Sequence, residues 1–186
     1  MKRKERIIEK IIFREPKVSD IMKLYKMYTL LSEETKKFFH PFPERILSVS
    51  SLFTWIPLAL SCIRSLRKAL LKIMPFLVYI SICSVYSSEV IGFAYIRLRN
   101  KFYGSLGIVV RDGFQGLGIG SKMLHYLIIL ARKEGLKKIR LTVLADNYRA
   151  IKLYEKFRFK RVRFIKGGDT YKGKRYDCIE MILELC

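Results

Sequence analysis

The chain has 186 residues, a length typical of one domain and sufficient to bury a hydrophobic core. Lys and Arg number 37 against 16 Asp and Glu, which gives a formal net charge of +21, and 51% of the residues are hydrophobic. This composition excludes a disordered acidic chain and disfavours polycationic substrates such as polyamines. It predicts a folded protein that attracts anions, such as a phosphate-rich ligand, a nucleic acid or an anionic lipid surface.

The cysteines and histidines form no pattern typical of a metal or disulfide site. The four cysteines are scattered without a CxxC pair, and the chain has only two histidines. We therefore expect reduced thiols and no metal. The first ten residues are charged throughout and lack the apolar segment of a secretory signal, so the sequence predicts a cytoplasmic protein.

The N-terminal part is predicted to contain a strand, a helix and a loop. Residues 11–14 form a short β-like run, and Ser19 is positioned to cap a helix over residues 20–31, whose apolar residues fall at helical spacing. Residues 36–43 mix lysine and phenylalanine with two prolines, which forbid a continuous helix. The sequence therefore predicts a loop for residues 36–43.

An apolar stretch without charges runs over residues 46–63 and is followed by a basic run that ends near Lys72. Its length just reaches that of a membrane span, but Pro57 in its middle and five Ser and Thr residues argue against one. We expect an apolar and basic helical insertion at about 46–74 that packs on the sheet or on a partner subunit, which leaves a homodimer open. Contact with a membrane surface is disfavoured.

The remaining chain alternates strands and helices. Strands are predicted at 76–86, 90–98, 103–110, 139–144, 159–165 and 176–183, and helices at 119–134 and 147–157. A loop rich in glycine and lysine is predicted between the last two strands. This order predicts a single α/β domain over residues 1–186, with a mixed, twisted central sheet flanked by helices.

A glycine-rich turn stands between the strand at 103–110 and the helix at 119–134. Glycines at 113, 116, 118 and 120 allow the backbone to approach an anion closely, at the positive end of a helix dipole. The turn is not a Walker A loop, because Gly120 is followed by Ser121 and Lys122 in the wrong register. From these residues alone, phosphate binding and tight structural packing both remain open.

Two motifs that follow one another along the chain resemble those of the GCN5-related N-acetyltransferase superfamily. The first is the hydrophobic pair Val109-Val110 followed by Gln115 to Gly120, which is similar to the family's strand and Gln/Arg-x-x-Gly-x-Gly/Ala turn. The second is the segment 142–159, which is similar to a strand followed by Asn-x-x-Ala-x-x-Leu-Tyr-Glu-Lys-x-Gly-Phe. Arg158 stands where the family usually has glycine. The resemblance covers residues 76–185 well and the insertion hardly at all.

The resemblance implies a sheet that opens beside the strand ending at Val110, with acetyl-CoA as cosubstrate in the opening. The pantetheine arm would pair with the backbone of Ile108 and Val110 and would contact Asn147. The implied cofactor-binding residues are Ile108, Val109, Val110, Gln115, Gly116, Leu117, Gly118, Ile119, Gly120, Ser121, Asn147 and Tyr154. The candidates to reach the CoA phosphates are Arg111, Lys122 and Lys152.

The chemistry of acetyl transfer requires proton movements. An alkyl ammonium with a pKa of about 10.4 must lose its proton near pH 7, which costs roughly 4.6 kcal/mol, and the departing thiolate benefits from a proton donor. Tyr154 suits the donor role: it lies two helical turns after Asn147, on the same helix face, and the resemblance assigns the general acid to this position. The backbone amide of Val110 is the candidate for stabilising the oxyanion.

The general base and the acceptor remain open. Glu33, Glu34 and His40 are candidate bases, while backbone carbonyls acting through water, or an acceptor amine of low pKa, would need none of them. The predicted function is direct acetyl transfer to a primary amine of a small molecule or a protein, and the positive charge favours an anionic acceptor. The alternative is a catalytically silent module of the same fold that binds acyl-CoA or nucleic acid.

Overall fold

The computed structural model describes residues 7–39, 61 and 78–185. The insertion predicted at about 46–74 lies outside these residues, except for Ser61. The described elements are β1 (Ile12–Arg14), the 3-10 helix η1 (Val18–Asp20), α2 (Ile21–Thr29), α3 (Glu33–Phe38), β2 (Tyr79–Tyr86), β3 (Glu89–Asn100), β4 (Tyr103–Val110), α6 (Ile119–Lys133), β5 (Lys138–Leu144), α7 (Tyr148–Lys156), β6 (Lys160–Tyr171) and β7 (Lys174–Glu184). None of the described helices is long and apolar enough to cross a membrane.

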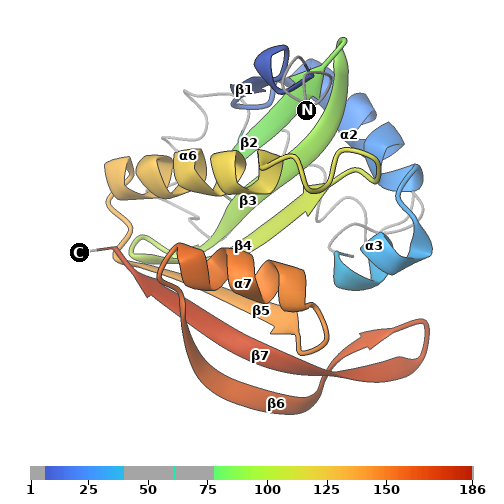
Figure 1. The fold of residues 1–186 in the computed structure, drawn as a ribbon. Helices are drawn as coiled ribbons and strands as arrows, with labels where there is room; N and C mark the ends of the chain where they lie inside the picture. The colour runs from blue at the N-terminus through green and yellow to red at the C-terminus, as the bar shows by residue number, and fades with distance from the viewer. Residues whose placement is uncertain (1–6, 40–60, 62–77, 186) are drawn as a thin grey trace.

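The described strands form one seven-stranded sheet in the order β1-β2-β3-β4-β5-β7-β6. β4 and β5 run parallel, and the other neighbouring pairs are antiparallel. The sheet is strongly twisted and helices lie against it (Figure 1). These features confirm the predicted α/β fold with a mixed central sheet flanked by helices.

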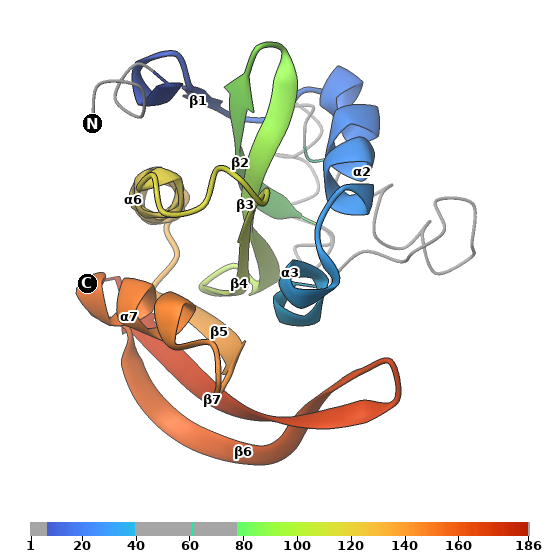
Figure 2. The ribbon, with the colours of Figure 1, turned by 45° about the vertical axis from the view of Figure 1, so that its right-hand side comes forward.

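Helices cover both faces of the half of the sheet that contains β2, β3 and β4 (Figure 2). On one face, α6 contributes the fully buried Met123, Leu124 and Leu127 to the larger hydrophobic core. On the opposite face, α2 contributes Leu24 and Met27 to a second core. The apolar residues of each helix recur at helical spacing, which is why these helices could be predicted from the sequence.

The two halves of the sheet are joined by a short parallel pairing between β4 and β5. Only Tyr103–Ser105 of β4 pairs with β5, at Lys138–Arg140. The second half of β4, up to Val110, is paired with β3 on one side and has no pairing to β5 on the other. The sheet is therefore open beside the end of β4, as the family resemblance implies.

The sequence predicts a loop for residues 36–43, but the structure shows a helix over the first part of this segment. Its first three residues form the last turn of α3, because Ser32 caps this helix by accepting a hydrogen bond from the Thr35 amide. Acidic residues in the first turn and lysines in the last turn favour the helix through its dipole. The prolines that argue against a helix follow its end, and residues 40–43 lie outside the described part of the chain.

The start of α2 also differs from the prediction. Ser19 lies inside η1 and does not cap α2, whose N-cap position is occupied by Asp20. The Asp20 carboxylate is instead bound by Arg14, at 2.6 and 3.0 Å, and by the Lys17 amide at 2.7 Å. The Asp20 side chain of this ion pair is nearly inaccessible, whereas that of Arg14 is 29% exposed, and the pair fixes the chain between β1 and α2.

Two of the three glycines predicted in a loop between the last two strands, Gly167 and Gly168, lie within β6. β6 continues to Tyr171, and the turn is made by Lys172 and Gly173, with φ values of 48° and 77°. Gly167 and Gly168 accommodate an irregularity in the β6–β7 pairing between Ile165 and Asp169. The resulting hairpin is longer than predicted and extends toward α3 (Figure 1).

Candidate active site

A cleft of about 800 Å³ lies beside the free end of β4. It is bordered by the glycine-rich turn, the start of α6, α7 and α3. The predicted site residues that line it are Ile108, Val109, Val110, Gln115, Gly116, Gly118, Ile119, Gly120, Ser121, Asn147 and Tyr154. Leu117 is the exception, since it packs against the larger hydrophobic core and is not among the lining residues.

The glycine-rich turn adopts backbone conformations that other residues rarely take. Gly113, Gly116 and Gly118 have φ values of 82°, 79° and 77°. Gly118 is the N-cap of α6, so the unpaired amides of the first helical turn meet the cleft together with the positive end of the helix dipole. No acidic residue in the first turn of α6 opposes this field. The turn is therefore suited to hold a phosphate group.

The free edge of β4 supplies backbone groups to the cleft. The Arg111 amide donates to the Ile91 carbonyl of β3 at 2.8 Å. Because amide direction alternates along a strand, the amides of Val110 and Ile108 point away from β3, toward the cleft. The Val110 carbonyl accepts a hydrogen bond from the Gln115 side chain at 3.0 Å on this side. An extended ligand could thus pair with β4 as an added strand.

Tyr154 lies against the wall of the cleft on α7. The residue is 7% exposed, and its ring packs on Phe159 with 5.7 Å between centroids. Burial raises the pKa of the Tyr154 hydroxyl, which therefore stays protonated at neutral and moderately alkaline pH. Asn147 caps α7 by accepting a hydrogen bond from the Ala150 amide at 3.1 Å. Asn147, Ala150 and Tyr154 all line the cleft. Their predicted alignment on one helix face is confirmed.

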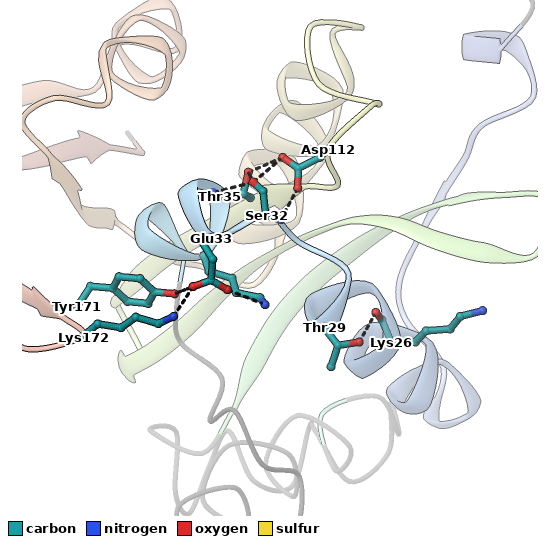
Figure 3. A network of polar contacts seen from close by, with 9 residues as sticks. Lys26, Thr29, Ser32, Glu33, Thr35, Asp112, Tyr171 and Lys172 are labelled. Carbon is teal, nitrogen blue, oxygen red and sulfur yellow. Dashed lines mark hydrogen bonds and ion pairs between the residues drawn. The ribbon is translucent and has the colours of Figure 1, made fainter.

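A polar network joins the glycine-rich turn to α3 (Figure 3). Asp112 accepts hydrogen bonds from the Ser32 amide at 2.7 Å and the Thr35 hydroxyl at 2.6 Å, and Gln115 donates to Thr35 at 3.2 Å. Burial of Asp112 opposes its ionisation, but these hydrogen bonds outweigh burial and lower its pKa. Sequence reasoning missed this network, although Ser32 followed by two glutamates could have indicated a helix start.

Glu33 connects the other side of α3 to the tip of the β6–β7 hairpin (Figure 3). Its carboxylate binds the Lys172 ammonium and accepts a hydrogen bond from the Tyr171 hydroxyl at 3.0 Å. Hydrogen bonds from Lys172, Lys36 and Tyr171 lower the pKa of Glu33 to about 2. Such a carboxylate is a poor proton acceptor near neutral pH. Of the other candidate bases, Glu34 lines the cleft, and His40 lies outside the described residues.

We expect Glu33→Gln to release the hairpin from α3. The lowered pKa means that the contact is present above the ordinary carboxyl pKa of about 4.5 and is lost as the pH falls toward about 2. At neutral pH the variant should show several-fold faster amide hydrogen exchange over residues 169–175 than the native protein. Glu34→Gln, on the same helix, serves as the control. Equal exchange in the native protein and in Glu33→Gln would contradict the contact.

Basic side chains reach the cleft from α7. Arg149 donates to the Gln115 side chain at 3.2 Å, across the cleft from α7 to the glycine-rich turn, and Lys152 also lines the cleft. Arg111 pairs with Glu89 at 3.0 Å outside the lining, and Lys122 lies over an aromatic ring of the N-terminal strand. The structure thus brings Lys152 to the cleft but not Arg111 or Lys122, and it adds Arg149.

Among the residues that the structure describes, carboxylates and thiols do not gather into a metal centre. In residues 7–39, 61 and 78–185, no group of three His, Cys, Asp or Glu side chains is arranged to hold a metal ion. The cleft instead combines backbone donors, a buried phenol and arginine, which are groups suited to binding a phosphorylated ligand and to donating a proton.

Comparisons with known proteins agree with this geometry. A model of the Acetyltransferase (GNAT) family matches residues 27–159. The acetyltransferase of the GNAT family from Streptococcus pneumoniae is 25% identical, with 94% of this chain and 98% of that chain covered and a TM-score of 0.72. yncA from Salmonella typhimurium, whose structure was solved with its cofactor acetyl-CoA, is 19% identical, with 95% of each chain covered and a TM-score of 0.72.

A third solved structure has a named protein acceptor. The ribosomal-protein-S18-alanine N-acetyltransferase from Escherichia coli is 20% identical, with 94% of each chain covered and a TM-score of 0.66. At this identity the likeness shows a shared fold. A search of curated proteins finds no match.

Proposed function

Since the chain belongs to the GNAT family of acetyltransferases, we propose that it transfers the acetyl group of acetyl-CoA directly to a primary amine. The observation that carries this proposal is the meeting of three features in one cleft: a glycine-rich helix start, the free edge of β4 and the buried Tyr154. Acetyl-CoA supplies an activated thioester, and the residues of the chain bind it, orient it and move protons around it.

The residues present fit the phosphate and pantetheine parts of CoA. The amides from Gln115 to Ser121 would hold the pyrophosphate at the start of α6. The backbone of Ile108 and Val110, directed toward the cleft, would pair with the amides of the pantetheine arm. Support for this fit comes from Gly120, where an added Cβ would meet Leu153, Ile108 and Val110 at 3.6–3.9 Å, so that this position lies in contact with the β4 side chains that border the cleft.

Two groups of the chain would act on the thioester of acetyl-CoA. The Val110 amide would stabilise the negative charge that develops on the thioester oxygen, because a preorganised donor needs no rearrangement during the reaction. Tyr154 would donate its proton to the departing sulfur. Its raised pKa keeps the hydroxyl protonated, so that it is available as a hydrogen-bond and proton donor when negative charge develops on the sulfur.

The acceptor amine would enter beside α3. Glu34, Phe38 and Phe39 line this part of the cleft, and Asp146 there is paired with Lys37 at 2.9 Å. Glu34 is exposed, so it would attract an ammonium and relay its proton through water. Small molecules and protein N-termini both present such an amine, and the net charge of +21 favours acceptors that also carry anionic groups.

The test begins with binding and proceeds to turnover. We expect saturable binding of acetyl-CoA in a calorimetric titration of the native protein, followed by thiol release when amines are added. A panel of amino acids, amino sugars, nucleotide-linked amines and peptides would then identify the acceptor class. Binding of acetyl-CoA without thiol release for any amine would favour the silent binding module, and absence of binding would refute the proposal.

Arg149→Gln is expected to weaken acetyl-CoA binding about 10-fold, because a charge-assisted bond to phosphate is worth roughly 1.5–3 kcal/mol. Gln115 also donates to the Thr35 hydroxyl and the Val110 carbonyl, so the loop itself should keep its conformation. The loss should shrink at high salt, which screens the arginine charge in the native protein. Calorimetry at two salt concentrations checks this, with Arg132→Gln, an exposed change on α6, as control. Equal affinities of native and variant protein would remove Arg149 from the phosphate site.

A further inference from the structure

We propose that one face of the sheet, beside the cleft, binds the phosphodiester backbone of a nucleic acid. A cross-strand row of paired residues runs over this face from β3 to β6: Arg97 opposite Ser105, Ser105 opposite Arg140, Arg140 opposite Ile182, and Ile182 opposite Lys160. Directly paired residues project from the same face of a sheet. The row therefore presents Arg97, Arg140 and Lys160 together.

Further basic residues flank this row on the same face. Arg99 lies two positions from Arg97 and donates to the Ser105 hydroxyl at 3.1 Å. Lys138 lies two positions from Arg140, and Arg163 is paired with Glu180, two positions from Ile182. Residues two apart in a strand share a face. We call the six basic residues the basic sheet face: Arg97, Arg99, Lys138, Arg140, Lys160 and Arg163.

The charge of the basic sheet face is only partly balanced. Glu180, whose side chain is 8% exposed, lies between Arg140 and Arg163 and binds both, and Glu184 pairs with Lys138 at 3.0 Å. Two carboxylates against six basic groups leave an excess of four positive charges. Within the described part of the chain, the ion pairs leave Arg97, Arg99 and Lys160 without a carboxylate partner.

The basic sheet face is accessible and borders the acetyl-transfer cleft, whose lining includes Thr142, two positions from Arg140. The side chain of Arg163 is 62% exposed and that of Arg140 37%, while Arg99 and Lys160 are exposed residues. None of the six lines the cleft. Adjacent strands are about 4.8 Å apart, so the row from β3 to β6 spans roughly 19 Å, enough to follow several successive phosphates.

The composition of this face favours a nucleic acid over a lipid surface. Four of the six basic residues are arginines, whose planar guanidinium matches phosphate oxygens with paired hydrogen bonds. Of the exposed large apolar side chains of the described chain, Phe164 and Tyr126 lie outside the row, and Val162 stands between Lys160 and Arg163 as a single aliphatic side chain, which is a weak anchor for a bilayer. A repeating polyanion can engage cations placed at regular strand spacing, one phosphate after another.

The test compares two variants with the same change in charge. Arg97, Arg99 and Arg163 are replaced by glutamine in one, and the exposed Lys17, Arg132 and Lys133 in the other. Binding to fluorescein-labelled single-stranded RNA, duplex RNA and duplex DNA is measured by fluorescence polarisation between about 0.05 and 0.2 M salt. The first variant should lose at least about 10-fold in affinity, and its salt slope should fall by about 3, one for each lost phosphate contact. The second should keep the native slope.

The remaining arms distinguish other polyanions and check folding. Thermal melting followed by circular dichroism verifies that both variants fold, and Arg99→Gln alone provides a milder change if the triple variant does not. Polyglutamate and vesicles of anionic lipid are used as competitors. The proposal is overturned if the native protein does not bind nucleic acid, if both variants lose equal affinity, or if polyglutamate or vesicles displace the nucleic acid at equal charge concentration.

Discussion

Tyr154→Phe is expected to lower kcat for acetyl transfer about 100-fold while leaving the Kd of acetyl-CoA within about twofold, as befits loss of a general acid. The phenyl ring preserves the packing on Phe159, at 5.7 Å between centroids, so the wall of the cleft should keep its shape. Only the hydroxyl group is removed. Steady-state thiol release measures kcat, and calorimetry measures the affinity for acetyl-CoA.

The pH dependence separates Tyr154 from the groups that deprotonate the acceptor. Because burial raises its pKa, the Tyr154 hydroxyl stays protonated through about pH 10, and its loss should lower the whole pH profile of kcat without shifting its limbs. Tyr126→Phe is the matched control, because Tyr126 is 46% exposed on α6 and does not line the cleft. An unchanged kcat in Tyr154→Phe would rule out the proton-donor role.

The glycine-rich turn and α7 could be predicted from the sequence because their determinants are local. Gly118 must adopt a φ of 77° to start α6, and Asn147 caps α7 through an atom three residues away. Even the departure at Arg158 is accommodated locally: this residue takes the left-handed conformation usual for glycine, with a φ of 66°, at a cost of roughly 1 kcal/mol. Motif and geometry agree at these positions.

The polar contacts of α3 with the glycine-rich turn and with the β6–β7 hairpin could not be predicted, because the paired residues are distant in the sequence. Asp112 binds Ser32 and Thr35 across about 80 residues, and Glu33 binds Lys172 across 139. No periodicity or spacing encodes such pairs. They depend on where the sheet brings the chain together, as does the register that aligns the basic sheet face. The glycines of β6 misled for a related reason: a bulge and a loop have the same local composition.

Gly120→Trp is expected to abolish measurable acetyl-CoA binding, with a loss of at least about 100-fold, whereas Gly120→Ala should bind within about threefold of the native protein. An added Cβ would point toward Leu153 at 3.6 Å and toward Ile108 and Val110 at 3.9 Å, which are ordinary contact distances. Gly120 also has no positive φ, so neither substitution strains the backbone. Calorimetric titration of both variants measures the difference.

The pair of substitutions isolates occupancy of the cleft from damage to the helix. Alanine raises the helix propensity at position 120 and adds only one methyl group between α6 and α7. Loss of acetyl-CoA binding in Gly120→Ala would mean that the ligand contacts the backbone of the first turn of α6 too closely to tolerate a methyl group. Tryptophan fills that space from the same backbone position. If Gly120→Trp bound acetyl-CoA as the native protein does, the pantetheine arm could not run between Gly120 and β4, and the ligand path along Ile108 and Val110 would be wrong.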